Sequence, residues 1–137
     1  MNGFSGWLMP TSDMDWRKKW ETPSATTPQF TEARTVTVGQ RISVLTLFSN
    51  PQLRRGAADI TCDLEIVRPN GIADRHADVV CYRGPIHEDA RHVFLSSQVV
   101  EFVGEKDDPK GRWIVRVTLR DNLRRVSLPL TTSFVLR

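Results

Sequence analysis

Residues 113–119 alternate apolar and polar side chains directly after an Asp-Pro-Lys-Gly turn at 108–111, and this pattern most constrains the fold. Successive side chains of a strand point to opposite faces, so one face of this segment suits a core and the other suits water. Similar units of a turn followed by alternation recur from residue 34 onward. The sequence therefore predicts a small antiparallel β-domain.

Strand patterns fill most of the chain after residue 30. The predicted strands are 34–38, 41–48, 59–66, 77–82, 92–96, 98–103, 113–119 and 125–136. Seven or eight short strands at this spacing predict a sandwich or a barrel. Pro69-Asn70-Gly71 indicates a hairpin, and Pro129 indicates an edge position or a bulge in the last strand, because proline has no N–H. The expected core residues are Ile60, Cys62, Leu64, Val79, Trp113, Val115, Val117 and Leu119.

Residues 1–30 differ from the rest and are predicted to form an N-terminal extension to a sandwich domain at 31–137. A short helix is expected near 13–21, because Ser12 suits a helix start and acidic residues follow it. A Pro/Ser/Thr linker then follows, up to Pro28. Three tryptophans lie in this segment, and they either anchor it to the sandwich or form an exposed patch for a partner or a carbohydrate: Trp7, Trp16 and Trp20.

Composition limits the class of protein. The 137 residues suit one domain, and no apolar run is long enough to span a bilayer as a helix. Residues 1–4 have neither a basic start nor an apolar stretch, so we expect either a cytosolic protein or a mature form carrying a start methionine. The net charge of +3 and the excess of arginine are weak indications of a nucleic-acid partner.

The two cysteines permit two interpretations. If Asn70-Gly71 turns a hairpin, Cys62 faces positions 79–81 on the next strand, so a disulfide with Cys81 is geometrically reasonable. Two reduced thiols buried in the core are the alternative. Two cysteines are too few for a cysteine-only zinc site.

No pattern predicts an enzyme, a cofactor or a metal centre. His87 and His92 are five apart among acids, which is not the spacing that directs two imidazoles of a helix at one zinc ion. Asp107 and Asp108 stand between Lys106 and Lys110 and are interpreted as turn residues rather than calcium ligands. Neither a nucleophile elbow nor a glycine-rich phosphate loop occurs.

The best candidate binding surface is a group of arginines near the end of the chain. Alternation places Arg112, Arg116 and Arg120 on one strand face, and Arg124 and Arg125 begin the next strand. Guanidinium groups so arranged suit phosphates or acidic partners. Glu101 or Glu105 is expected to pair with them across strands.

Two short motifs carry a resemblance to a known superfamily. Val67-Arg68-Pro69-Asn70-Gly71 resembles the strand-Pro-x-Gly turn of many bacterial immunoglobulin-like and macroglobulin-type domains. The segment Asp108-Pro109-Lys110-Gly111-Arg112-Trp113-Ile114-Val115 is similar to their entry into the penultimate strand, with Trp113 at the aromatic corner. The resemblance spans roughly residues 32–137 and lacks the Cys…Trp…Cys framework of antibody domains. It implies an all-β, immunoglobulin-like sandwich in a small secreted or periplasmic bacterial protein.

The resulting functional hypothesis is a non-catalytic binding or structural module of the bacterial cell envelope. It would recognise a protein partner through the arginine-bearing sheet face or by strand addition at an edge. The alternative is a cytosolic module that binds nucleic acid or an acidic protein through the same arginines. A carbohydrate binder that uses the three N-terminal tryptophans is a third hypothesis.

Overall fold

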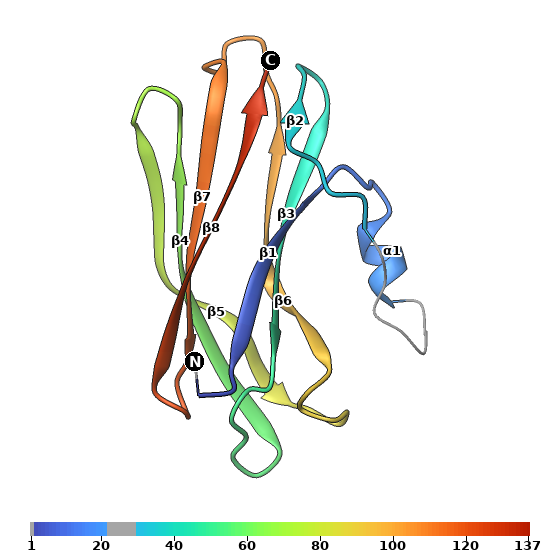
Figure 1. The fold of residues 1–137 in the computed structure, drawn as a ribbon, viewed down its shortest axis with the longest axis vertical. Coiled ribbons are helices and arrows are strands. Elements are labelled where there is room, and N and C mark those ends of the chain that lie inside the picture. Colours follow the sequence, from blue (N-terminus) through green and yellow to red (C-terminus); the bar gives the residue numbers. More distant parts are fainter. Residues whose placement is uncertain (1, 22–29) are drawn as a thin grey trace.

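Two β-sheets face each other in the computed structural model, which describes residues 2–21 and 30–137 (Figure 1). The smaller sheet has the strand order β1 (Ser5–Thr11), β3 (Arg41–Ser49) and β6 (Val93–Val103). The larger sheet has the order β2 (Thr35–Val36), β8 (Val126–Leu136), β7 (Gly111–Asp121), β4 (Ala57–Val67) and β5 (Ala73–Pro85). A short helix, α1 (Trp16–Glu21), lies outside the sheets. The predicted immunoglobulin-like β-sandwich is confirmed.

The main core lies between the sheets, where the sequence alternation places it. Seven of the eight predicted core residues are buried: Ile60, Cys62, Leu64, Trp113, Val115, Val117 and Leu119. The eighth, Val79, is only partly buried, because β5 forms an edge of its sheet. The Trp113 ring packs against Phe102 and Phe134, at centroid distances of 4.7 and 6.3 Å. Its indole N–H donates to the carbonyl of Pro109 at 3.0 Å, which fixes the turn that enters β7.

The hairpin expected at 69–71 is present and joins β4 to β5. The N–H of Gly71 donates to the Arg68 carbonyl, and the N–H of Ile72 donates to the Asn70 side chain. Gly71 has a φ of 88°, a conformation that glycine adopts without steric penalty. The hairpin therefore places β4 and β5 antiparallel and in register for the cysteines.

One strand was missed, and it changes the expected domain boundary. The sequence predicts residues 5–11 to lie in an extension outside the sandwich, but they form β1, which pairs antiparallel with β3. Gly6 and Pro10 weaken a strand pattern, and this hid the strand. A Cβ on Gly6 would lie 2.6 Å from Leu119 of the opposite sheet, so close packing requires the glycine. Pro10 is tolerated because β1 forms an edge.

The chain changes sheets between β1 and β2, and α1 lies in this crossing. The two ends of this crossing segment are hydrogen-bonded to each other. The Thr11 hydroxyl donates to the Thr31 carbonyl at 2.7 Å, and the Thr31 N–H donates to Asp13 at 2.8 Å. The helix begins at Trp16 rather than near residue 13, because Asp13 makes this contact instead of capping a first turn. The predicted Pro/Ser/Thr linker lies almost wholly at 22–29, outside the described residues.

Strand β3 is apolar on both faces, which is unusual for a sandwich strand. Ile42, Val44 and Phe48 belong to the main core, whereas Leu45 and Leu47 point to the outer face and are nevertheless at most 3% exposed. Helix α1 lies on that side of the smaller sheet (Figure 1), and its Trp16 side chain is buried. We infer that α1 covers the apolar outer face through this tryptophan.

Pro129 occupies an unpaired edge, as the sequence predicted. It stands opposite Thr118 of β7. On its other side β8 pairs with β2 only at Val135 and Leu136. The missing N–H of the proline therefore removes no ladder hydrogen bond from that side.

Candidate binding surface on the five-stranded sheet

The five candidate arginines do not form one surface. Arg112, Arg116 and Arg120 lie on the outer face of β7, as predicted. Arg124 lies in the turn between β7 and β8, where it donates to the carbonyls of Asn2 at 2.6 Å and Asn50 at 2.9 Å. It therefore joins the N-terminus to the loop after β3, which is a structural role. Arg125 is exposed in the same turn with a φ of 61°.

The arginines of the outer face are paired with acids of β4 and β5. Glu65 of β4 accepts hydrogen bonds from Arg116 of β7, at 2.9 Å, and from Arg75 of β5. One row further along, Arg120 donates two hydrogen bonds to Asp63 of β4, at 2.8 and 3.0 Å. In each of these two rows of side chains, an arginine of β7 is therefore hydrogen-bonded to a carboxylate of β4.

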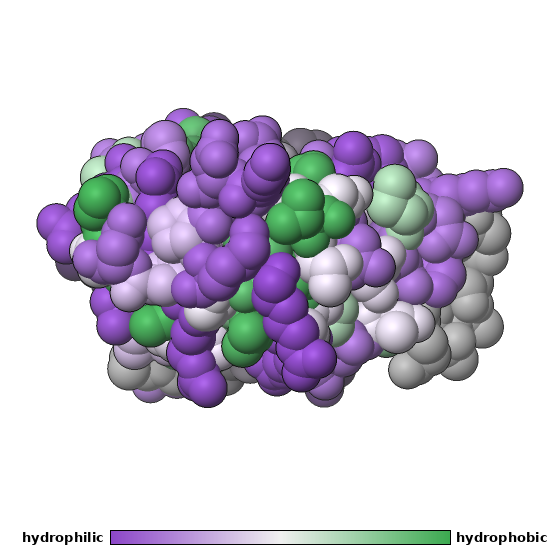
Figure 2. Space-filling model, turned by 90° about the horizontal axis from the view of Figure 1, so that it is seen from above, coloured by the Kyte–Doolittle hydropathy of each residue, from purple (hydrophilic) through white to green (hydrophobic). Residues whose placement is uncertain are grey.

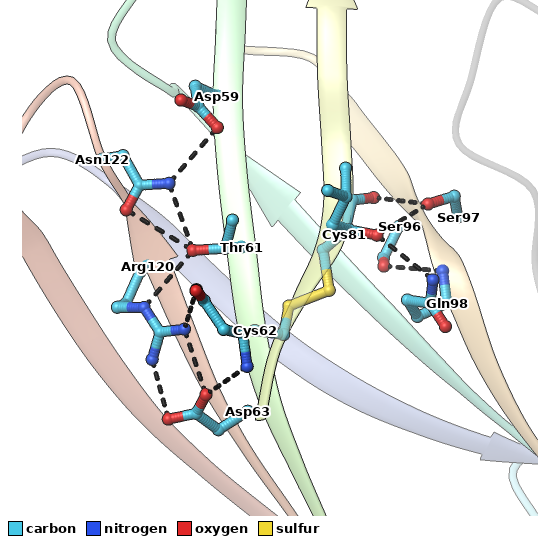
Figure 3. Close-up of a disulfide and its surroundings, with 12 residues drawn as sticks. Asp59, Thr61, Cys62, Asp63, Cys81, Ser96, Ser97, Gln98, Arg120 and Asn122 are labelled. Atoms are coloured by element: carbon cyan, nitrogen blue, oxygen red, sulfur yellow. Dashed lines mark hydrogen bonds and ion pairs between the residues drawn. A yellow bond between two sulfur atoms is a disulfide. The ribbon is translucent and has the colours of Figure 1, made fainter. Parts of the chain in front are cut away.

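The pairing continues onto β5 and toward the β7–β8 turn. Arg120 also lies 3.1 Å from Asp78 of β5. Asp59 accepts from Asn122 at 3.2 Å and from Arg83 at 3.1 Å, and Figure 3 shows Arg120, Asp63, Asn122 and Asp59 along one side of β4. We call these rows the charge ladder, which consists of Asp59, Asp63, Glu65, Arg75, Asp78, Arg83, Arg116, Arg120 and Asn122.

Charge on this face is nearly balanced. The ladder holds four arginines and four acids, and Arg112 adds one further cation, for which no carboxylate partner occurs among the described residues. Cross-strand ion pairs of this kind also hold the side chains in fixed positions. The face therefore presents positive and negative side chains at fixed positions, rather than a basic patch.

The expected acidic partners were wrong. Glu101 lies on β6 in the opposite sheet. Glu105 lies in the loop after β6, where its backbone N–H donates a hydrogen bond to the Asp108 carboxylate. The true partners, Asp63 and Glu65, alternate with the core residues of β4, and that signal was visible in the sequence. The missing information was that β4 lies beside β7, which alternation within one strand cannot reveal.

These contacts set the pKa values of the carboxyl groups. Hydrogen bonds from Arg120, together with the backbone N–H of Asp78, lower the pKa of Asp63. Hydrogen bonds from Arg75 and then from Arg116 lower the pKa of Glu65. Because both values are lowered by folding, the stability from these pairs is complete above the usual carboxyl range and is lost as the pH falls through the lowered values.

We expect the Arg120→Ser substitution to raise the pKa of Asp63 toward its usual value, because the largest cause of its lowering is removed. For Glu65, Arg75→Ser should raise the pKa more than Arg116→Ser does. NMR titration of the side-chain carboxyl carbons measures both effects. Asp89, whose pKa is lowered chiefly by the backbone N–H of Arg91, is the internal control. An unchanged Asp63 titration in the Arg120→Ser protein would show that the pair does not form in solution.

The disulfide alternative is the correct one for the cysteines. Cys62 and Cys81 are bonded across β4 and β5 with a Cα–Cα distance of 5.9 Å, and both are completely buried. Cys62 lies between Thr61 and Asp63, which contact Arg120 on the outer face, so the disulfide joins β4 to β5 on the core side of the charge ladder (Figure 3).

Strand β5 and strand β6, at neighbouring edges of the two sheets, are joined to each other. Their ladders are both irregular, beside Cys62 in β4–β5 and at Leu45/Leu47 in β3–β6. Ser97 of β6 donates to the carbonyls of Val80 and Cys81 at 3.2 and 3.1 Å, and Gln98 donates to Val80 at 3.2 Å (Figure 3). Bulged edges with occupied carbonyls are poor templates for an added strand.

The three N-terminal tryptophans are not gathered as an exposed patch. Trp16 is 4% exposed, with the Arg17 guanidinium 4.6 Å from its ring centroid. Trp7 lies in β1 and Trp20 in α1, and each is half-buried. Because the central member is buried, this part of the chain serves as an anchor, and the carbohydrate hypothesis loses its three-ring platform.

The described residues contain no group of three or more His, Cys, Asp or Glu side chains that could hold a metal ion. His87 and His92 lie exposed in and beside the loop that joins β5 to β6. Helix α1, the helix within the described ranges, is too short to cross a bilayer.

No protein-family model and no curated protein sequence matches the chain. An alkylpurine DNA glycosylase of Pseudomonas fluorescens, solved bound to DNA with an abasic-site analogue, is similar with a TM-score of 0.50 and 14% identity, over 98% of this chain and 30% of that chain. The chain thus spans less than a third of that enzyme. An immunoglobulin-like protein of Pseudomonas aeruginosa is similar with a TM-score of 0.41 and 15% identity, over 97% of this chain and 92% of that chain. A Niemann-Pick type C2 protein of the Japanese carpenter ant is similar with a TM-score of 0.41 and 11% identity, over 98% of this chain and 91% of that chain. At 14% identity, the likeness to the glycosylase indicates a common fold alone.

Proposed function

We propose that this chain is a non-catalytic binding module of the bacterial cell envelope, which recognises a protein partner through the outer face of the five-stranded sheet. The observation that carries the proposal is the charge ladder, in which arginines and carboxylates alternate across three strands at fixed positions. Such an arrangement is complementary to a protein surface that carries both positive and negative side chains. It disfavours partners that would place like charges opposite each other.

The long strands offer little free edge, which favours the face over strand addition along them. β5 and β6 are bulged and joined through Ser97 and Gln98. The end of β1 is covered where Ala33 donates to the carbonyl of Pro10, and Pro129 interrupts the open part of β8. The outer face, whose charged side chains are held by cross-strand hydrogen bonds, is therefore the favoured surface for a partner.

The near balance of charge favours a protein partner over nucleic acid. Phosphate backbones are neutralised by several cations that are free to contact them. Here Arg116 and Arg120 are already engaged with carboxylates, which a phosphate would have to displace. We therefore treat nucleic-acid binding as an outcome of the test rather than as a second proposal.

The test begins with a photo-crosslinking residue placed at Thr118, in the centre of the face, in cells of the native host. The captured protein is then purified, and its affinity is measured for the wild type and for the Arg112→Ser/Arg116→Ser/Arg120→Ser protein. We expect the triple substitution to weaken binding roughly tenfold or more, because paired interface charges are lost.

The matched control replaces three exposed arginines outside the face, Arg54, Arg91 and Arg137, and changes the net charge equally. It should bind as the wild type does. Duplex DNA binding that falls steeply with salt, and that is lost in the face variant but kept in the control, would support the nucleic-acid alternative instead. Full affinity in the face variant would refute the proposal.

The envelope location is supported by the disulfide, because such bonds persist in oxidising compartments. Its direct test is the intact mass of the protein isolated from its host, with and without reduction. A fully oxidised Cys62–Cys81 pair agrees with the envelope. Two free thiols would place the protein in the cytosol.

A further inference from the structure

A groove of about 480 Å³ opens at the end of the sandwich where β2 and β3 begin and β6 ends. Met14 and Ala33 line it from the base of the crossing segment. Val36 of β2, Ile42 of β3 and Val103 of β6 line it from the sheets. It is thus formed by four segments that meet only in the folded protein, and it is remote from the charge ladder.

Exposed apolar side chains gather around this groove. Met14 and Val103, which line it, are 69% and 43% exposed, and Val38, beside the lining residue Gly39, is 46% exposed. Figure 2 views this end of the molecule and shows hydrophobic side chains near its centre among hydrophilic ones. Water-exposed apolar side chains around a concave site are typical of a binding surface rather than of an ordinary loop.

The groove also exposes an open strand edge. The carbonyls of Arg34 and Val36 accept from the N–H groups of Val135 and Arg137 of the β8 segment. Alternate residues of a strand turn their backbone groups to opposite sides, so the N–H and C=O of Thr35 point away from β8. Thr35 is exposed and lines the groove. The backbone groups that an extended peptide needs for pairing are therefore available at the wall.

A cation completes the site. Arg41, the first residue of β3, lines the groove and is exposed, and no carboxylate pairs with it among the residues the structure describes. β1 ends at Thr11, opposite Ser43, so Arg41 extends beyond the end of its neighbour strand. An incoming carboxylate would find this guanidinium unengaged.

We propose that the groove binds an extended peptide segment of a partner protein, which presents a carboxylate to Arg41 and an apolar side chain to Val103 and Met14. Its backbone pairs with Thr35 and so extends the two-residue strand β2. Backbone pairing supplies affinity, and the apolar and cationic walls supply specificity. This site is independent of the sheet face and would stand if that proposal failed.

The probes are peptides recovered from a display library of random short sequences with free C-termini, synthesised and titrated into the isotope-labelled full chain. The recovered peptides should share a carboxylate near an apolar residue. Their addition should shift the NMR signals of Thr35, Arg41 and Val103. Val103→Asp and Arg41→Glu should each weaken binding roughly tenfold or more, because one contact is replaced by a repelling or polar group.

The matched control is Ile72→Asp, because Ile72 is an apolar side chain that is 56% exposed in the β4–β5 hairpin and does not line the groove. Its affinity should equal that of the wild type. Methylating the peptide nitrogen that pairs with the Thr35 carbonyl should weaken binding roughly fivefold, the value of one hydrogen bond. Failure to recover binders, shifts elsewhere, equal losses with Ile72→Asp, or displacement by dodecanoate without any effect of N-methylation would each overturn the peptide proposal.

Discussion

Replacement of Trp113 by alanine is expected to lower the free energy of unfolding by about 3–5 kcal/mol, the range for removal of a buried tryptophan. Trp113 is 4% exposed and stacks on Phe134, and its indole N–H holds the Pro109 carbonyl. The substitution therefore opens a cavity between the sheets and frees the turn that enters β7. Urea unfolding followed by far-ultraviolet circular dichroism measures the loss.

Two further variants separate the causes. Trp113→Phe keeps an aromatic ring but cannot donate to Pro109, so it should lose less than Trp113→Ala. Trp20→Ala removes a half-buried ring from α1 and should lose the least. If Trp113→Ala and Trp20→Ala were equally destabilising, the corner tryptophan would not have the central structural role that its burial implies.

The second large effect is expected from the disulfide. Replacing Cys62 and Cys81 together by alanine should lower the free energy of unfolding by about 3 kcal/mol, the chain-entropy value for a closed loop of this length. The two cysteines are 19 positions apart, and β5 is an edge strand that pairs only with β4 in its sheet, so the bond closes the loop between these two strands. Urea unfolding of the oxidised wild type and of the double variant gives the difference.

Reduced wild-type protein is the control, because it keeps both side chains and loses only the bond. It should unfold close to the double variant. A loss below about 1 kcal/mol in both proteins would mean that the β4–β5 pairing persists in the unfolded ensemble. The Asp63 titration in the same samples would then report whether the charge ladder still forms.

The sequence predicted the parts of the fold that depend on local pattern. Trp113, Val115 and Val117 alternate so regularly that their strand and its buried face followed directly. The hairpin at Asn70-Gly71 set the neighbour of β4 and placed Cys62 near Cys81. These features require only residues that are close in sequence.

The parts that failed depend on distant neighbours. β1 was missed because Gly6 and Pro10 weaken a strand signal, although their places are explained by Leu119 and by the sheet edge. The arginines of β7 were assigned the wrong acids, because strand order is not encoded in alternation. The groove at the end of the sandwich is lined by four segments that are separate in the sequence, so no single stretch of sequence predicts it.

The position of β8 has a consequence for biosynthesis. β8 lies inside the larger sheet, between β7 and β2, and Arg34 donates to Thr132, which follows it by 98 positions. While a ribosome is still making residues 126–136, β7 has an open side and β2 has no partner strand. Closure of the sandwich therefore waits for the last strand, and long-range pairing of this kind is slow. A nascent chain that stays open in this way leaves the inner faces of its sheets accessible to chaperones until β8 has left the ribosome.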